Sequence, residues 1–494
     1  MVATTESSAK YRSLSSPEEI LADHEDQEVN MDESLAAQDP GLSDHSVDTR
    51  VRWTYFLLGC AILLPWNALI IATPFFLSRL VGSSIYATFS SYESSVFTAA
   101  NLLFQAYCTA TSKQASPSRR VFGSIVVLIF STSLLFISTF IRATPSIFAA
   151  FILLSAVCFA ASSAYISTSV YAGAALLGPS YLQSMMSGQA AIAFGLSAVQ
   201  VAGSAVSVWG ATPESIAYFV AHGDAGDGRA EEVAARIFFG ISTAFLALTF
   251  VSYAWLTRQP IYKSAVGVLE RTHKVAVVQE EDDEELRGLM SDGPSSASLD
   301  SRTHIYRVCK ENFIFMFSVA YVFSVTLAIF PAITVTVQPT NPNVHPLLFT
   351  AVHFLAFNVG DFFGRYSCSF PRLVIWSAHK ILVISLLRTL FIPIFLLCNV
   401  QRPSGTLPIP PLISSDVLYM LILLALGLSN GYTSVLCMLA APSLEHNPRL
   451  KGRREDVDLA ATLAGFFLIV GLAVGAFLSF GVRASICDCN PFKM

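Results

Sequence analysis

An acid and a base stand four residues apart in one of the apolar stretches of this sequence. Asp361 and Arg365 lie within the segment FNVGDFFGRY at residues 357–366. On a helix this spacing brings both side chains to one face. A charge at the centre of a bilayer costs about 2.5–3.5 kcal/mol on insertion scales, so both groups should face a protein interior or a wet cavity. We place no other acid inside an apolar stretch, and an intramembrane ion pair predicts a functional site.

The composition predicts a membrane protein with many spans. Of the 494 residues, 53% are hydrophobic and 13% are charged, whereas an ordinary soluble domain has about 25% charged residues. Each apolar stretch has about 18 to 26 residues, which is long enough to cross a hydrocarbon core of about 30 Å. We expect an all-α membrane protein with eleven spanning helices, at residues 53–77, 94–111, 121–141, 147–171, 184–209, 233–256, 313–337, 347–366, 378–398, 417–440 and 459–482.

Two polar segments divide the chain. Residues 1–52 contain twelve acidic and four basic side chains, which predicts a disordered tail. Residues 257–311 contain an acidic run at 280–285 followed by serines, which predicts a disordered linker. We therefore expect a six-helix bundle at 53–256, a five-helix bundle at 312–482 and a short extracellular or lumenal tail at 483–494.

The distribution of Lys and Arg predicts the orientation in the membrane. Beyond the N-terminal tail, the connections on the side of the N-terminus contain 16 of these residues and those on the other side contain six. Cytoplasmic loops are enriched in Lys and Arg, so the N-terminus and the linker should lie in the cytoplasm. The sequence leaves open whether the membrane is the plasma membrane or an internal one, such as that of the vacuole.

Motifs of soluble enzymes are absent from the sequence. It contains no Gly-rich phosphate loop, no His-Glu-x-x-His and no paired Cys-x-x-Cys. Cys487 and Cys489 are two thiols one residue apart without a second pair, which is a weak metal site. We expect no catalytic residues, no cofactor, no metal ion and no nucleic-acid partner, and hence no enzyme.

Other cations also fall within the predicted spans. Arg236 and Lys380 stand near helix ends, where long side chains reach the headgroups. Arg388 lies about ten residues into its span, near the midplane. Asp361 cannot neutralise both Arg365 and Arg388, so the interior should be positive, which argues against a cationic substrate. The alternative for the pair is that it only locks two helices together.

The residues around the pair resemble a known family. Asn358-x-x-Asp361-x-x-Gly364-Arg365 is similar to the signature of the equilibrative nucleoside transporters, in a fungal-like or protist-like form. Other motifs with family counterparts follow in the same order: LPWN at 64–67, SGQ at 187–189, FPAIT at 330–334, Arg388 with FIP at 391–393 and LCN at 397–399, SNGY at 429–432, and Gly471-x-x-x-Gly475. The family often has Gln-Gly in its fourth span, whereas this chain has Ser167-Thr168, so base contacts can differ.

The resemblance implies a carrier for nucleosides such as uridine and adenosine, with nucleobases left open. It implies a 6+5 arrangement in the style of the major facilitator fold, alternating access and a functional monomer in a lipid bilayer. A carboxylate can accept hydrogen bonds from ribose hydroxyls, and aromatic walls can stack on the base. The substrate-binding residues implied by the resemblance are Leu63, Trp66, Asn67, Ile70, Phe330, Phe354, Asn358, Asp361, Arg365 and Leu472. Residues expected in gating or packing are Ser167, Gly188, Arg388 and Asn430.

Three alternatives remain at the level of the sequence. GDFFGR at 360–365 also resembles the loop motif of major facilitators for sugars and drugs, which would make the solute another small polar molecule. His353 lies eight residues before Asp361 and titrates near pH 6.5 in its free form, so a proton-coupled nucleoside transporter is conceivable. A membrane receptor or scaffold would transport no solute.

Overall fold

A computed structural model describes residues 47–209, 229–267, 296–341, 344–400 and 412–487. Of these, the residues from Thr49 onward form one compact unit. Most of the expected N-terminal tail, the acidic run of the linker and Cys489 lie outside the described residues.

The first half of the chain contains six long helices, and the first five of them follow one another with short connections. Prolines occupy the first positions of three of them, where the missing N–H is not needed by the helix. The helices are α2 (Thr49–Arg79), α3 (Phe89–Ala110), α4 (Pro117–Ser138), α5 (Pro145–Leu177), α6 (Pro179–Ser207) and α8 (Arg229–Leu256). Helix α2 begins inside the segment expected to be a tail.

The second half contains four long helices and two shorter ones, α14 and α15, that share one expected span. They are α12 (Phe313–Ile329), α13 (Pro346–Ser367), α14 (Ala378–Leu387), α15 (Phe391–Leu396), α16 (Asp416–Ala440) and α17 (Val457–Cys487). Within the described residues, ten helical segments are long and apolar enough to cross a membrane. Helix α3, which has 22 residues and is more polar, overlaps the second expected span at 94–111 and is not among these ten. The prediction of an all-helical, multi-span membrane protein is confirmed.

Two expected spans are not continuous α-helices. Helix α12 ends before Phe330-Pro331, and the chain continues into the 3-10 turn η3 (Thr334–Thr336). The span at 378–398 is divided into α14, the 3-10 turn η5 (Arg388–Leu390) and α15. Prolines at 331 and 393 explain both interruptions, because a proline cannot donate the backbone hydrogen bond that a continuous helix requires.

The described ends of the linker are helical, contrary to the expectation of disorder. Helix α9 (Pro260–Ala265) is anchored by Tyr262, whose hydroxyl lies 2.9 Å from that of Tyr253. Helix α11 (Ser296–Glu311) is anchored by His304 and Arg307, which both bond to Asp456 in η7 (Arg454–Asp456). These partners are distant in sequence, so local composition could not predict that the two segments are helical.

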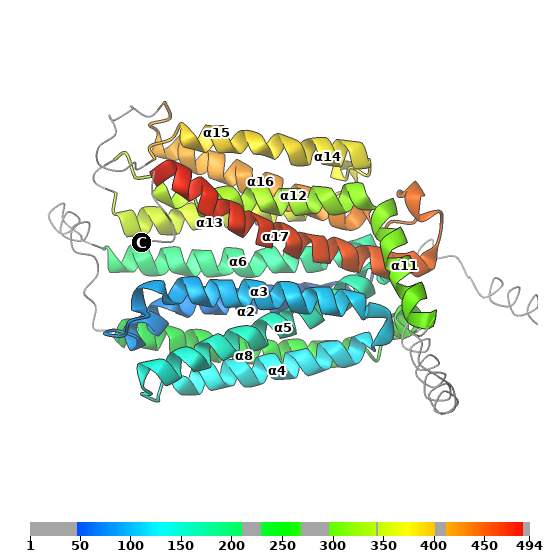
Figure 1. Cartoon of the computed structure of the whole chain (residues 1–494), viewed down its shortest axis with the longest axis horizontal. Helices are drawn as coiled ribbons and strands as arrows, with labels where there is room; N and C mark the ends of the chain where they lie inside the picture. Colours follow the sequence, from blue (N-terminus) through cyan, green and yellow to red (C-terminus); the bar gives the residue numbers. More distant parts are fainter. Residues whose placement is uncertain (1–46, 210–228, 268–295, 342–343, 401–411, 488–494) are drawn as a thin grey trace, which may run out of the picture. The chain divides into compact units, whose positions relative to one another are not determined.

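The two halves of the chain meet along a few helices. Figure 1 shows α2, α3, α4, α5 and α8 together, and α12 to α16 together, with α6 and α17 between the two groups. Helix α6 packs against α2 and α13, and α17 packs against α12, α3 and α5. The face of α13 that contains Asp361 therefore lies at the junction of the halves.

Glycines allow some of these helices to touch through their backbones. A Cβ atom on Gly188 of α6 would lie 2.1 Å from the carbonyl oxygen of Phe56 in α2. A Cβ atom on Gly364 of α13 would lie 2.2 Å from the carbonyl oxygen of Leu428 in α16. Because lipid supplies no hydrophobic force between helices, such close packing is a main source of their association.

We predict that Gly364→Ala lowers the thermal stability of the purified protein. The added methyl group overlaps the α16 backbone, and overpacking of this kind costs about 1–3 kcal/mol. Gly123→Ala in α4 is the matched control, because a Cβ atom there meets nothing within 4 Å. Equal unfolding midpoints for the two variants would contradict the close contact.

Candidate functional site

Asp361 and Arg365 form a buried ion pair on α13. Arg365 Nε donates to Asp361 Oδ2 at 2.9 Å, and the two residues are only 5% and 6% exposed. Asn430 of α16 donates its amide Nδ2 to Asp361 Oδ1 at 2.7 Å. Both carboxylate oxygens therefore have a donor. The close contact of α13 with α16 holds Asn430 in position, because its neighbour Gly431 packs directly on the Asp361 carbonyl group.

Arg388 lies in the 3-10 turn η5 that interrupts its span, and it adds further hydrogen bonds to this network. Its guanidinium donates to the hydroxyl of Thr326 in α12 at 2.6 Å, to the carbonyl oxygen of Leu426 at 3.2 Å and to Ser429. Thr326 in turn donates to Asn430 Oδ1 at 2.7 Å. With its oxygen engaged in this way, the Asn430 amide presents its NH₂ group to Asp361. Asn430 thus makes the interhelical hydrogen bonds expected of an intramembrane amide.

The charges of this network do not cancel. Asp361 forms its ion pair with Arg365, and the hydrogen-bond acceptors of Arg388 are neutral groups. One acid and two buried guanidinium groups leave one positive charge in excess. The other two intramembrane cations lie elsewhere: Arg236 pairs with Glu232 at 2.9 Å, and Lys380 is exposed at the start of α14.

Arg365 also connects the two halves of the protein. Its Nη1 donates to the carbonyl oxygen of Met186 at 3.3 Å and to Gln189 Oε1 at 3.2 Å, both in α6. Gln189 Nε2 continues the chain of hydrogen bonds to the hydroxyl of Tyr171 in α5 at 3.0 Å. The Arg365 side chain thus contacts α6 directly and is connected to α5 through Gln189.

Asn358 makes a further hydrogen bond between α13 and α6. It lies one turn before Asp361, and its Nδ2 donates to Ser197 Oγ of α6 at 2.6 Å. Gly188, which was expected to act in packing or gating, stands next to Gln189 and lets α6 approach α2.

Five side chains of the network were not among the expected site residues, and one of them, Ser429, stands in the SNGY motif. Gln189 stands in the SGQ motif, so the resemblance contained the information needed to include it. Thr326, Tyr171 and Ser197 stand in apolar or small-residue runs without a recognisable motif. Their hydrogen bonds join helices distant in sequence, and no local pattern predicts those contacts.

Phe330 and Phe354 belong to an aromatic cluster beside the network. Phe330 stacks on Phe357 with ring centroids 4.1 Å apart and packs edge-on against Phe354 at 5.3 Å. His353 joins the cluster, is 1% exposed and hydrogen-bonds to Thr334 through Nε2 at 2.7 Å. This histidine is therefore buried inside the protein, where the return of the chain through η3 covers it.

The expected site residues of α2 have different surroundings. Trp66 packs on Phe97 of α3 with ring centroids 4.8 Å apart, and Asn67 donates to the carbonyl oxygen of Leu63 in its own helix at 2.9 Å. Leu63 is half-buried and Ile70 is exposed. Among the residues that the structure describes, no hydrogen bond or ring contact joins these positions to Asp361.

Two further expected residues also lie apart from the ion pair. Ser167 of α5 donates to Gln105 of α3 at 3.0 Å, so it acts within the first half. Leu472 is half-buried on α17, beside the close contact of Gly471 with Ala320 of α12. The structure brings together Asp361, Arg365, Asn358, Asn430 and Arg388, and not the whole expected set.

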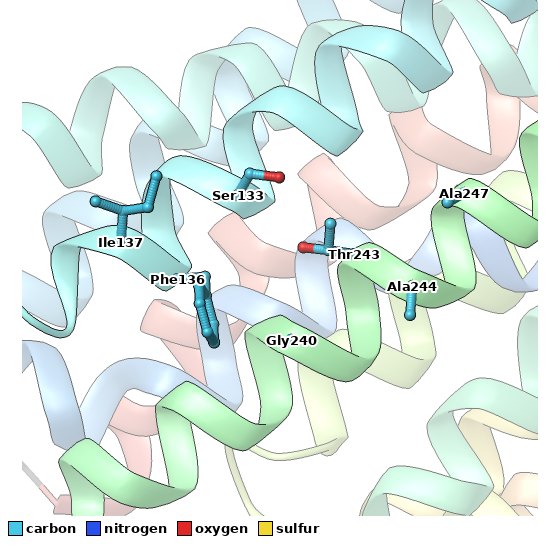
Figure 2. Close-up of a pocket in the computed structure, with 7 residues that line it drawn as sticks. All are labelled: Ser133, Phe136, Ile137, Gly240, Thr243, Ala244 and Ala247. Carbon is cyan, nitrogen blue, oxygen red and sulfur yellow. The ribbon is translucent and has the colours of Figure 1, made fainter.

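A cavity of about 530 Å³ opens between α4 and α8, away from these residues (Figure 2). The two hydroxyl groups in its lining, those of Ser133 and Thr243, bond to carbonyl oxygens of their own helices. An apolar groove without free donors does not suit a polar solute. Within the described ranges, no group of three His, Cys, Asp or Glu side chains could hold a metal ion.

The chain is similar in sequence to known transporters. The chain is 26% identical over 476 residues to equilibrative nucleoside transporter 1 of Rattus norvegicus, and 27% identical over 467 residues to equilibrative nucleoside transporter 2 of Homo sapiens. Both matches cover 87% of this chain and 96% of the relative.

A solved structure shows the same fold. The proton:xylose symporter XylE of the major facilitator superfamily superposes with a TM-score of 0.51, over 90% of this chain and 91% of that one, at 12% identity.

The family model described as nucleoside transporter matches residues 153–484. This match covers more than half of the sequence and includes the whole Asp361 network, so the chain belongs to the nucleoside transporter family.

Proposed function

We propose that this protein is a facilitative carrier that moves nucleosides across a membrane by alternating access. The observation that supports this most directly is the buried ion pair at the junction of two helical halves, within a chain of the nucleoside transporter family. Its curated relatives are named equilibrative nucleoside transporters. Since one chain contains both halves, we propose that a monomer is sufficient.

Asp361 is the proposed acceptor for the ribose hydroxyls. An ionised carboxylate can accept about four hydrogen bonds, and Arg365 and Asn430 supply two of them. The remaining capacity suits a pair of neighbouring hydroxyls. Phe330 and Phe354 would provide the apolar wall for the base. The rest of the proposed lining comes from three helices and consists of Leu63, Trp66, Asn67, Ile70, Asn358 and Leu472.

The polar contacts support a state that is closed at the end where α11 lies. Lys113 after α3 bonds to Asp458 of α17 at 3.1 Å and to the carbonyl oxygen of Glu455 at 2.8 Å, which joins the halves there. Arg365 lies nearer than Asn358 to the C-terminal end of α13, so its contacts with α6 are closer to this closed end. With the N-terminus in the cytoplasm, as the Lys and Arg distribution indicates, this state would be open to the opposite side.

Uptake into proteoliposomes tests the proposed function. We expect saturable uptake of labelled uridine and adenosine that follows the nucleoside gradient, with no uptake of labelled glucose. Glucose uptake would favour a sugar carrier of the major facilitator type. The absence of flux for all three solutes would favour a receptor or scaffold.

We predict that Asp361→Asn and Arg365→Leu each abolish transport in protein that is still inserted. Leaving one charge of a buried pair without its partner costs about 3–5 kcal/mol, and Asp361→Asn also weakens the proposed ribose acceptor. The double variant should remain inactive, whereas a purely structural pair predicts substantial rescue. Glu445→Gln is the control, because that side chain is 85% exposed.

We predict that adenosine competes with labelled uridine and that ATP does not. The positive interior would attract a nucleotide, yet the spans contain few further cations to replace the hydration that its phosphates lose. Free nucleobases should compete more weakly, because they lack the ribose. Inhibition by ATP as strong as that by adenosine would indicate a nucleotide carrier instead.

A further inference from the structure

Helix α3 contains a buried acid that the Asp361 network does not use. Glu93 is 3% exposed, and its Oε1 has no hydrogen-bond partner among the described residues. The expected span began at Ser94, but the helix begins at Phe89 and includes Glu93. Glu93 is thus a second buried acid, next to the start of an expected span rather than inside it.

The elements packed against α3 offer Glu93 no cation. Helix α5 contains no Asp, Glu, Lys, Arg or His, and α17 has none of them between Asp458 and Arg483, at its opposite ends. Arg79 of α2 pairs with Glu232 at 2.9 Å, and the remaining bases of that helix, Arg50 and Arg52, begin it at the far end.

The short turns next to α3 do not supply a cation either. The turn η1 (Tyr86–Thr88) contributes only the exposed phenol of Tyr86, and Lys113 of η2 (Ser112–Gln114) is engaged with Asp458. Helix α3 itself contains no Lys, Arg or His, and its other ionisable groups are Tyr92, Tyr107 and Cys108. Within the described residues Glu93 forms no ion pair.

A proton is the ligand that fits this carboxyl group. Burying an ionised carboxylate without a partner costs several kcal/mol, so the neutral acid is the stable form in these surroundings. Calcium-like cations take about six to eight oxygen ligands, and no cluster of acidic, His or Cys side chains accompanies Glu93 in the described part of the chain.

The position of Glu93 connects this proton to the proposed pocket. Glu93, Phe97 and Ala100 are spaced as i, i+4 and i+7, so they share one face of α3, and all three are buried. Phe97 packs on Trp66, with ring centroids 4.8 Å apart. One turn of helix thus separates the acid from an aromatic pair in the proposed substrate wall.

We propose that Glu93 is a proton-binding site that controls the rate of transport. Its carboxylate takes up one proton from water when this face of α3 packs, which gives the neutral acid, and it returns that proton to water when the face is hydrated during the transport cycle. At high pH the ionised group opposes packing, so the cycle slows. This effect on the rate rests on the proposed carrier function, whereas the proton site itself does not.

Uptake at two pH values tests the effect on rate. Labelled uridine uptake is measured at about pH 5.5 and about pH 8, which lie on either side of the range where a perturbed carboxyl titrates, with the same pH inside and outside the vesicles. We expect the unmodified protein and the exposed control Glu445→Gln to be several-fold slower at the higher pH. Glu93→Gln, which imitates the neutral acid, should keep the faster rate at both.

Two results would overturn the proposal. One is a pH profile of Glu93→Gln that equals that of the unmodified protein. The other is loss of the profile in His353→Gln with Glu93 intact, which would assign the titration to the buried histidine. Glu93→Asp serves as the conservative variant, and it should retain the slowing at high pH.

Thermal unfolding of the purified protein provides a readout that does not require transport. A group that holds a proton in the folded state and loses it on unfolding makes stability fall as pH rises. We expect the unfolding midpoint of the unmodified protein to fall between about pH 5.5 and about pH 8 by more than that of Glu93→Gln. Equal slopes contradict the proton site. If the unfolding midpoint of the unmodified protein falls more steeply with pH than that of Glu93→Gln but no solute is taken up, the result supports the proton site and contradicts the proposed function.

Discussion

The structure depends on how two buried guanidinium groups are satisfied where water is scarce. Arg365 and Arg388 share a network with one carboxylate, so most of their donors must find neutral acceptors. Those acceptors come from α6, α12 and α16, which fixes the neighbours of α13 and of the interrupted span around Arg388. An unsatisfied polar group in hydrocarbon costs several kcal/mol. The need to provide acceptors for both guanidinium groups therefore also determines where these helices lie.

The sequence predicted the class of the protein and much of its order along the chain. Apolar length alone located the spans, because a helix that crosses a bilayer needs about 20 apolar residues. Helix interruptions at Phe330-Pro331 and Arg388 could be suspected from the nearby prolines, but where each helix resumes depends on tertiary contacts. The helical ends of the linker were missed, since Tyr262 and Asp456 stabilise them from positions distant in sequence.

The site was predictable in part. The i, i+4 spacing of Asp361 and Arg365 was sufficient to pair them, the position of Arg388 near the middle of its span singled it out, and the family resemblance added Asn430. Nothing local indicated that Thr326 orients the Asn430 amide, or that Gln189 receives Arg365. Glu93 was missed for a simpler reason, because an apolar window excludes the acid at its edge even when the helix continues through it.

The glycine contacts between α13 and α16 have a mechanical consequence. Two helices whose backbones touch cannot slide past each other without a clash, so Asp361 and Asn430 must travel as one rigid body. The Arg365 guanidinium is held to this body by its 2.9 Å ion pair with Asp361 and to the opposite body by two longer hydrogen bonds to α6, and Gln183 of α6 also donates to the Arg365 carbonyl oxygen at 3.4 Å. Interhelical hydrogen bonds in membranes average about 0.6 kcal/mol. Thermal motion can therefore break the hydrogen bonds between the guanidinium and α6 while the ion pair with Asp361 persists, so the two halves can separate without leaving a buried charge unpaired.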